Sequence, residues 1–148
     1  MIDRRDVIRL KVPFPTISAQ LAVKAHMYIC TSRRESEKRL VKCQTYKLST
    51  VIGSGDTVDR FVQENPCPER NPFKQATLTD CDKLFCTDTT IPLSLRAGCS
   101  VCEELIRDID MELCAICNVP VRMIRLSGDE LAQINPLIRT ATDRKSVV

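Results

Sequence analysis

The sequence predicts a small α+β domain that is mainly β, in which several short strands precede an amphipathic helix. Three observations support this class. Runs rich in β-branched residues recur along the first two thirds of the chain and are separated by turn-forming residues, which is typical of strands. From Val101 the apolar residues recur at a spacing of three and four, which is typical of a helix with one buried face. The length of 148 residues fits one domain with a core of its own.

The expected strands are short, and each ends at a turn or a proline. Pro13 ends the first, because proline has no N–H to donate to a neighbouring strand. Residues 83–87 either continue the strand before them or begin another. In chain order the expected strands span residues 6–12, 26–30, 39–46, 76–82, 89–93 and 119–126. Two Asn-Pro pairs and one Cys-Pro pair predict a long loop over residues 48–72, interrupted by a short helix around residues 57–64.

Two helices are expected in the C-terminal part of the chain. The longer one spans residues 100–117, with Ser100 as N-cap and Glu103 completing a capping box. The sequence Ser127-Gly-Asp-Glu130 is a second capping box, which opens a short helix that ends at Asn135-Pro136. The polar tail from Arg139 is expected to be frayed.

Composition excludes several classes of protein. With 43% hydrophobic and 28% charged residues, the chain is neither collagen-like nor wholly disordered. No run of apolar residues is long enough for a membrane helix, and we expect no secretory signal, because the N-terminus leads into no long apolar stretch. The chain has 9 cysteines, an odd number. Without an export signal this predicts a reducing, cytoplasmic location rather than a disulfide scaffold.

The cysteines include two CxxC pairs, Cys99 with Cys102 and Cys114 with Cys117, which is a pattern typical of zinc sites. If one helix spans this region, Cys102 and Cys114 lie about 18 Å apart along its axis and about 120° apart around it. One zinc ion cannot bind sulfurs so arranged, so we predict no metal site and expect most cysteines to pack as small apolar residues. A structural zinc site stays open only if the segment is not one helix.

The charge of the chain is unevenly distributed. Residues 1–50 contain 11 Lys and Arg against 4 Asp and Glu, whereas residues 51–118 contain 6 against 12. Either the N-terminal third faces a polyanion or an acidic partner, or the two segments attract each other across the fold.

The order of motifs adds a resemblance. The first strand runs into Val12-Pro-Phe-Pro15, and Lys24-Ala-His-Met-Tyr-Ile29 and Leu40-Val-Lys-Cys-Gln-Thr45 follow. Asp80-Cys-Asp-Lys-Leu-Phe-Cys-Thr87 and the helix of residues 100–117 complete the series. Over residues 5–117 the chain resembles the MazF/PemK family of toxin endoribonucleases from bacterial type II toxin–antitoxin modules. The stretch of residues 12–15 is the most specific part of this resemblance.

The resemblance implies an SH3-like barrel with a closing C-terminal helix, formed by residues 1–118 and assembled as a homodimer. Residues 119–148 would then be a short extension, in the same domain or partly mobile. The family's activity is cleavage of single-stranded RNA without a metal or other cofactor. The 2′-OH of the RNA attacks the adjacent phosphate and a 2′,3′-cyclic phosphate is left. The expected protein partner is an acidic antitoxin, and no membrane is involved.

The resemblance matches Lys24 to the family's catalytic arginine and Thr45 to its Thr or Ser. Here Lys24-Ala25 replaces Arg-Pro, and lysine offers a mobile point charge where arginine offers a planar fork. His26 lies two residues on, on the same strand face, and an unperturbed imidazole exchanges protons near neutral pH. The expected catalytic residues are therefore Lys24, His26 and Thr45, and the expected RNA-binding residues are Lys42, Gln44, Lys47, Thr16, Ser18 and Gln20.

Two further functions stay open at this point. Because Lys24 replaces an arginine, the domain is alternatively a non-catalytic module that binds RNA or a protein partner. The cysteines leave a zinc-binding protein as the other alternative. A cysteine nucleophile would pair His26 with Cys30 or Cys43, but no third residue is assigned to orient that pair.

Overall fold

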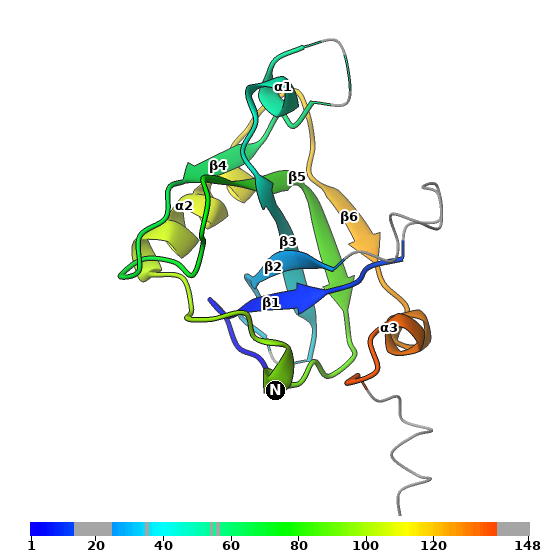
Figure 1. Cartoon of the computed structure of the whole chain (residues 1–148). Helices are drawn as coiled ribbons and strands as arrows, with labels where there is room; N and C mark the ends of the chain where they lie inside the picture. Colours follow the sequence, from blue (N-terminus) through cyan, green and yellow to red (C-terminus); the bar gives the residue numbers. More distant parts are fainter. Residues whose placement is uncertain (14–24, 35, 54, 56, 139–148) are drawn as a thin grey trace, which may run out of the picture.

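The structure is a computed structural model that describes residues 1–13, 25–34, 36–53, 55 and 57–138. Its centre is a mixed six-stranded sheet with a few helices around it (Figure 1). The strands β1 (Val7–Leu10), β2 (His26–Cys30), β3 (Lys38–Thr45), β5 (Thr77–Thr87) and β4 (Phe61–Glu64) follow one another in this order, and all pair antiparallel. The strand β6 (Arg122–Arg125) pairs parallel with β5.

The chain is therefore small and mainly β, as predicted. The sheet is not closed in the part of the chain that the structure describes, since β1 and β4 stand at its two ends and do not pair. The predicted strand of residues 26–30 matches β2, the first and last predicted strands each contain an observed one, and the third is displaced by one residue from β3.

The long strand β5 changes partners along its length. Residues 77–80 pair with β4, and residues 83–86 pair with β6. The register with β3 shifts between these two halves, because Leu40 pairs with Phe85 whereas Lys42 pairs with Asp80. Residues 83–87 thus continue the strand before them, and the irregularity bends β5 where it passes from one neighbour to the other.

Each face of the sheet packs against its own hydrophobic core. Successive residues of a strand point to opposite faces, so Leu40 joins one core and Val41 the other. The first core contains the buried residues Ile8, Leu10, Tyr28, Phe85, Leu126, Leu131 and Ile138. The second core contains Val7, Ile29, Cys43, Cys81, Leu105, Ile106 and Ile109. Residues from beyond position 118 therefore pack against the same core as β1.

The helix α2 (Glu103–Cys114) covers the second core, and it is shorter than predicted. Its N-cap is Cys102 and not the predicted Ser100. The sulfur of Cys102 accepts a hydrogen bond from the Leu105 N–H. The Ser100 hydroxyl instead donates to a carboxylate oxygen of Asp6 across 2.9 Å. Because α2 is continuous to Cys114, Cys102 and Cys114 stand at its opposite ends.

Two local predictions between the strands were wrong. Residues 57–64 do not form a helix: Phe61–Glu64 form β4, and the short helix is α1 (Leu48–Val51). Asp82 on β5 explains the difference, since its carboxylate accepts hydrogen bonds from the N–H groups of Asp59 and Arg60 and fixes this segment beside β5. In place of a strand at residues 89–93 there is the 3-10 helix η1 (Leu93–Leu95).

Ser127 is confirmed as the N-cap of the second predicted helix. The helix α3 (Gly128–Ile134) begins after Ser127, whose hydroxyl accepts a hydrogen bond from the Glu130 N–H. It ends before Asn135, as predicted, and the Asn135 amide donates to the Lys11 carbonyl across 2.8 Å. The tail from Arg139 lies outside the described residues. No helix in the described part of the chain is long and apolar enough to cross a membrane.

Candidate functional site

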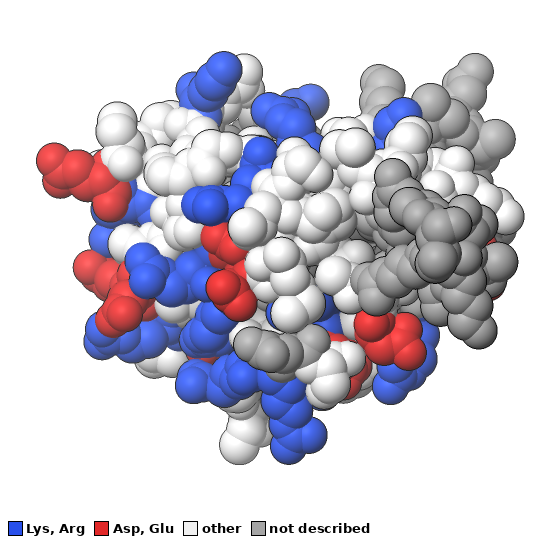
Figure 2. All heavy atoms as spheres, turned by 90° about the horizontal axis from the view of Figure 1, so that it is seen from below, with Lys and Arg blue, Asp and Glu red and all other residues white. Residues whose placement is uncertain are grey.

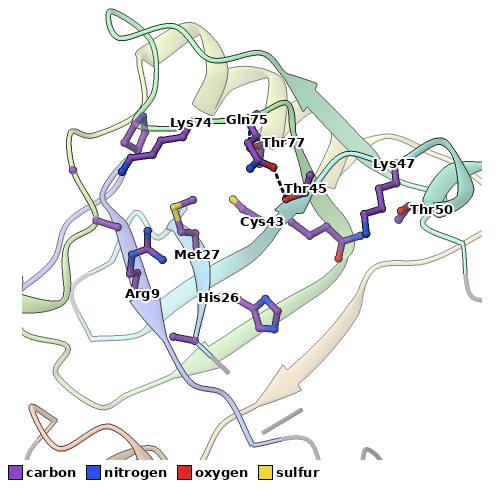
Figure 3. Close-up of a pocket in the computed structure, with 15 residues that line it drawn as sticks. Arg9, His26, Met27, Cys43, Thr45, Lys47, Thr50, Lys74, Gln75 and Thr77 are labelled. Carbon is purple, nitrogen blue, oxygen red and sulfur yellow. Dashed lines mark hydrogen bonds between the residues drawn. The ribbon is translucent and has the colours of Figure 1, made fainter. Parts of the chain in front are cut away.

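A pocket of about 960 Å³ opens where β1, β2, β3 and β5 meet the segments of residues 72–75 and 97–98 (Figure 3). Most of its lining side chains are polar or basic. They are Arg9, His26, Met27, Cys43, Gln44, Thr45, Lys47, Thr50, Lys74, Gln75 and Thr77, with Ala25, Pro72, Ala97 and Gly98 completing the wall.

The register of the strands determines which side chains form the floor of this pocket. Arg9 pairs with Met27, and Met27 pairs with Cys43, so these side chains form a row on one face of the sheet. Backbone hydrogen bonds fix the walls around the row. The Ala97 N–H donates to the Val7 carbonyl across 2.7 Å, and the Tyr46 N–H donates to the Ala76 carbonyl across 2.8 Å. The pocket is therefore formed by the arrangement of the strands and their connections.

The lining is basic and contains no carboxylate. Arg9, Lys47 and Lys74 are exposed cations that reach the pocket, and none of its lining residues is Asp or Glu. Figure 3 shows Arg9 and Lys74 on one side of the cavity and Lys47 on the other, with Thr45 and His26 between them. Among the residues that the structure describes, none forms an ion pair with these three cations. An anionic group that enters the pocket meets three cations that no acidic side chain of the described residues neutralises.

Other basic residues of the N-terminal third do have acidic partners. The guanidinium of Arg4 forms an ion pair with Asp110 of α2, and Arg33 reaches the same carboxylate across 3.3 Å. On the face seen from below, Lys and Arg lie interleaved with Asp and Glu (Figure 2). The excess charge of residues 1–50 is thus divided: part of it pairs with the acidic segment across the fold, and part faces the pocket.

The predicted site residues fall into three groups. His26, Gln44, Thr45 and Lys47 line the pocket together. Lys42 does not line it and instead lies opposite Asp80, with its pKa lowered by burial and by the nearby charge of Lys83, partly offset by Asp80. The predicted residues Lys24, Thr16, Ser18 and Gln20 lie outside the described residues.

The residues that come together do so at the ends of two neighbouring strands. His26 is the first residue of β2 and Thr45 is the last residue of β3. Since Tyr28 pairs with Lys42, strand alternation puts His26 level with Gln44 and on the face opposite to Thr45. The pocket reaches both faces at this end of the sheet, because its lining includes all three residues.

Sequence reasoning missed Arg9, Lys74 and Gln75. Arg9 carried a signal, since it is a charged residue between Ile8 and Leu10 in an otherwise apolar strand. Lys74 and Gln75 follow a proline-rich loop, and only the pairing of β3 with β5 brings them beside Thr45.

The pocket also contains a thiol, that of Cys43. Its residue is only 3% exposed, and its sulfur lies 3.9 Å from the Thr79 hydroxyl. Burial raises the pKa of the Cys43 thiol to about 12, although the hydrogen bond with Thr79 opposes the shift. The thiol stays protonated at neutral pH, and a protonated thiol is a poor nucleophile. The Cys–His alternative therefore gains no support from Cys43.

The described residues bring no three His, Cys, Asp or Glu side chains together in a group that could hold a metal ion. All 9 cysteines are free thiols, and Cys30, Cys43, Cys81 and Cys86 are buried. Cys102 and Cys114 are separated by the length of α2, as predicted for two cysteines at the ends of one continuous helix.

Comparison with models of known protein families gave no match, and comparison with curated proteins gave none either.

Proposed function

We propose that this protein is a toxin of a toxin–antitoxin system, an endoribonuclease that cleaves single-stranded RNA without a metal ion. The observation that supports RNA binding best is the pocket lined by Arg9, Lys47 and Lys74 with no carboxylate among its lining residues. Single-stranded nucleic acid is held mainly through its phosphates, and unpaired cations in a cavity supply that contact. His26 and Thr45, which the sequence predicts as catalytic, line the same cavity.

The proposed reaction is an intramolecular transfer. The 2′-oxygen of the RNA attacks the adjacent phosphorus, the bond from phosphorus to the 5′-oxygen breaks, and a 2′,3′-cyclic phosphate and a free 5′-hydroxyl are formed. A base must take the proton of the 2′-OH, and an acid must protonate the leaving oxygen. His26 takes the proton of the 2′-OH, and solvent water protonates the leaving 5′-oxygen and takes the proton back from His26, while Lys24 and the pocket cations stabilise negative charge on the phosphate oxygens. Thr45 contributes a hydroxyl that hydrogen-bonds with the phosphate.

The finer features of the proposal follow the sequence resemblance. We propose that the observed sheet belongs to an SH3-like barrel. We further propose that the protein is a homodimer in the cytoplasm and that an acidic segment of the antitoxin occupies the basic pocket. Charge supports the last of these, since a carboxylate-rich segment complements three cations in one cavity.

A non-catalytic RNA-binding domain is the second candidate. It is favoured by Lys24-Ala25, because a lysine holds a phosphate without the planar, bidentate geometry of an arginine. The same pocket would then bind RNA without cleaving it.

Incubation of the purified protein with a long single-stranded RNA in excess EDTA separates these functions. Cleavage to products with 2′,3′-cyclic phosphate ends is expected, and Lys24→Ala and His26→Ala are expected to abolish it. RNA binding that depends on salt, without cleavage at any protein concentration, would favour the second candidate. Absence of both binding and cleavage by a folded sample would overturn the proposal.

A further inference from the structure

Arg9 occupies a position in β1 where the strand pattern calls for a core residue. Ile8 and Leu10 point into the first core and are fully buried, and Val7, on the same face as Arg9, is buried in the second core. Arg9 alone in this strand is exposed. With an arginine at this position, the second core lacks an apolar side chain that it could otherwise bury. This indicates that the arginine has a function at the surface that it faces.

The surface that Arg9 faces is the pocket. Its register partner Met27 and the next residue across the sheet, Cys43, both line that cavity. No described residue offers Arg9 a carboxylate. Of the lining residues, Arg9 is the one with a guanidinium, while the other cations are the flexible lysines Lys47 and Lys74.

We infer that Arg9 is the residue that positions RNA in this pocket, because its guanidinium binds a phosphate in bidentate fashion and fixes the RNA backbone in one register. The inference rests on the proposed RNA binding and deepens it. A planar fork with parallel N–H donors matches two phosphate oxygens, whereas a lysine ammonium holds the same group as a point charge. A single arginine therefore positions the backbone, and the lysines on either side add attraction that depends little on geometry.

The test measures binding of a single-stranded RNA oligonucleotide whose 2′-hydroxyls are all methylated, so that it binds but cannot be cleaved. Wild type, Arg9→Ala, Arg9→Lys and Arg122→Ala are titrated over a series of salt concentrations. Arg122 is the matched control, because it is an exposed strand arginine outside the pocket. Unfolding midpoints of all four proteins are measured first, to show that each is folded.

Arg9→Ala is expected to weaken binding by about tenfold or more and to reduce the slope of log affinity against log salt by about 0.7. Arg9→Lys is expected to restore the salt slope but not the full affinity, because it keeps the charge and loses the fork. Arg122→Ala should bind like wild type.

The inference is overturned if wild type binds and Arg9→Ala binds equally well, or if Arg9→Lys recovers the full affinity. Either result leaves the proposed RNA binding standing. If wild type itself does not bind the oligonucleotide at low salt, the proposed function fails, and the role of Arg9 fails with it. Equal losses in Arg9→Ala and Arg122→Ala would show a general effect of charge and would also overturn the inference.

Discussion

The hydroxyl of Thr45 donates a hydrogen bond to Oε1 of Gln75 across 3.5 Å, which joins the end of β3 to the segment before β5 at the pocket (Figure 3). Both residues are exposed, and the distance is at the long end of hydrogen-bond geometry. The bond therefore adds little to the stability of the fold. In this structure Gln75 accepts the single proton of the hydroxyl, so a phosphate oxygen that is to accept that proton must displace Gln75, and the length of the bond makes this displacement cheap.

Thr45→Val is expected to lower RNA cleavage by about tenfold to a hundredfold, because it removes a hydrogen-bond donor from the proposed site and keeps the shape of the side chain. The unfolding free energy should change by less than about 0.5 kcal/mol. Thr90→Val is the matched control, since Thr90 is half-buried and outside the pocket. Initial rates of cleavage measure the effect. A Thr45→Val protein that cleaves like wild type would remove Thr45 from the proposed site.

The elements that the sequence predicted well are those whose pattern is local. The run His26 to Cys30 is apolar or aromatic after its first residue and is followed by a polar turn, and the spacing from Val101 to Leu113 gives one apolar face. Ser127 likewise begins α3 through a contact three residues away. These features depend on neighbours in the chain, so they can be read from it.

The features that sequence reasoning missed depend on contacts between distant segments. The carboxylate of Asp82 holds the N–H of Arg60, 22 residues away, and this contact favours a strand over the predicted helix. Arg9 and Lys74 meet at one pocket only because four strands align between them. No local pattern contains that information, which is why two of the three pocket cations, Arg9 and Lys74, were not predicted.

Gly98 at the pocket is expected to be intolerant of a side chain. Its backbone has a φ of +83°, and a Cβ added there would lie 2.8 Å from Cβ of Pro72. Gly98→Ala therefore combines a disfavoured backbone conformation with a close contact, and we expect a loss of about 1–3 kcal/mol in unfolding free energy. Urea denaturation measures it. Gly55→Ala is the control, because its Cβ would meet no atom within 4 Å. Equal stability of the two variants would contradict the expectation.

Arg60 links β4 to the end of α2 and should be important for stability. It is 5% exposed, and its guanidinium donates to the Val119 carbonyl across 2.7 Å and to the Glu112 carbonyl across 2.8 Å. Arg60→Met would leave these carbonyls without that donor, at a cost of about 2–4 kcal/mol in unfolding free energy. The comparison is Arg107→Met, which removes an exposed ion pair with Glu103 and should cost less than about 0.5 kcal/mol. Similar losses in both variants would argue against this role of Arg60.

The cysteines should differ sharply in reactivity. Cys99, Cys114 and Cys117 are exposed, whereas Cys43 and Cys81 are buried. Burial raises the pKa of the Cys43 thiol to about 12 and raises that of Cys81 as well. The thiolate is the form that reacts with iodoacetamide. At about pH 8 the reagent should therefore modify the three exposed cysteines first and leave Cys43 and Cys81 unmodified until the protein unfolds. Peptide mass spectrometry with time measures the order. Modification of Cys43 at the rate of Cys114 in native protein would contradict it.

The burial of Asp80 predicts how the stability of the fold depends on pH. It is buried on β5 opposite Lys42, and its Oδ1 accepts a hydrogen bond from the Asp82 N–H across 2.9 Å. Burial raises the pKa of the Asp80 carboxyl above its ordinary 3.8, against the opposing effects of that hydrogen bond and of Lys83 and Lys42. The folded chain therefore holds this proton more firmly than the unfolded chain does. Ionisation of Asp80 costs stability as the pH rises through its folded pKa.

Asp80→Asn removes the charge and keeps the acceptor oxygen for the Asp82 N–H. The unfolding free energy of wild type relative to this variant is expected to be highest near or below pH 3.8, to fall as Asp80 ionises in the folded state, and to level off by neutral pH. Urea denaturation of both proteins between about pH 3.5 and 7 measures the difference. Asp88→Asn, at an exposed aspartate, controls for the loss of one negative charge. A relative stability that rises with pH over this window would reverse the sign and show that Asp80 is stabilised as a carboxylate by Lys42 and Lys83.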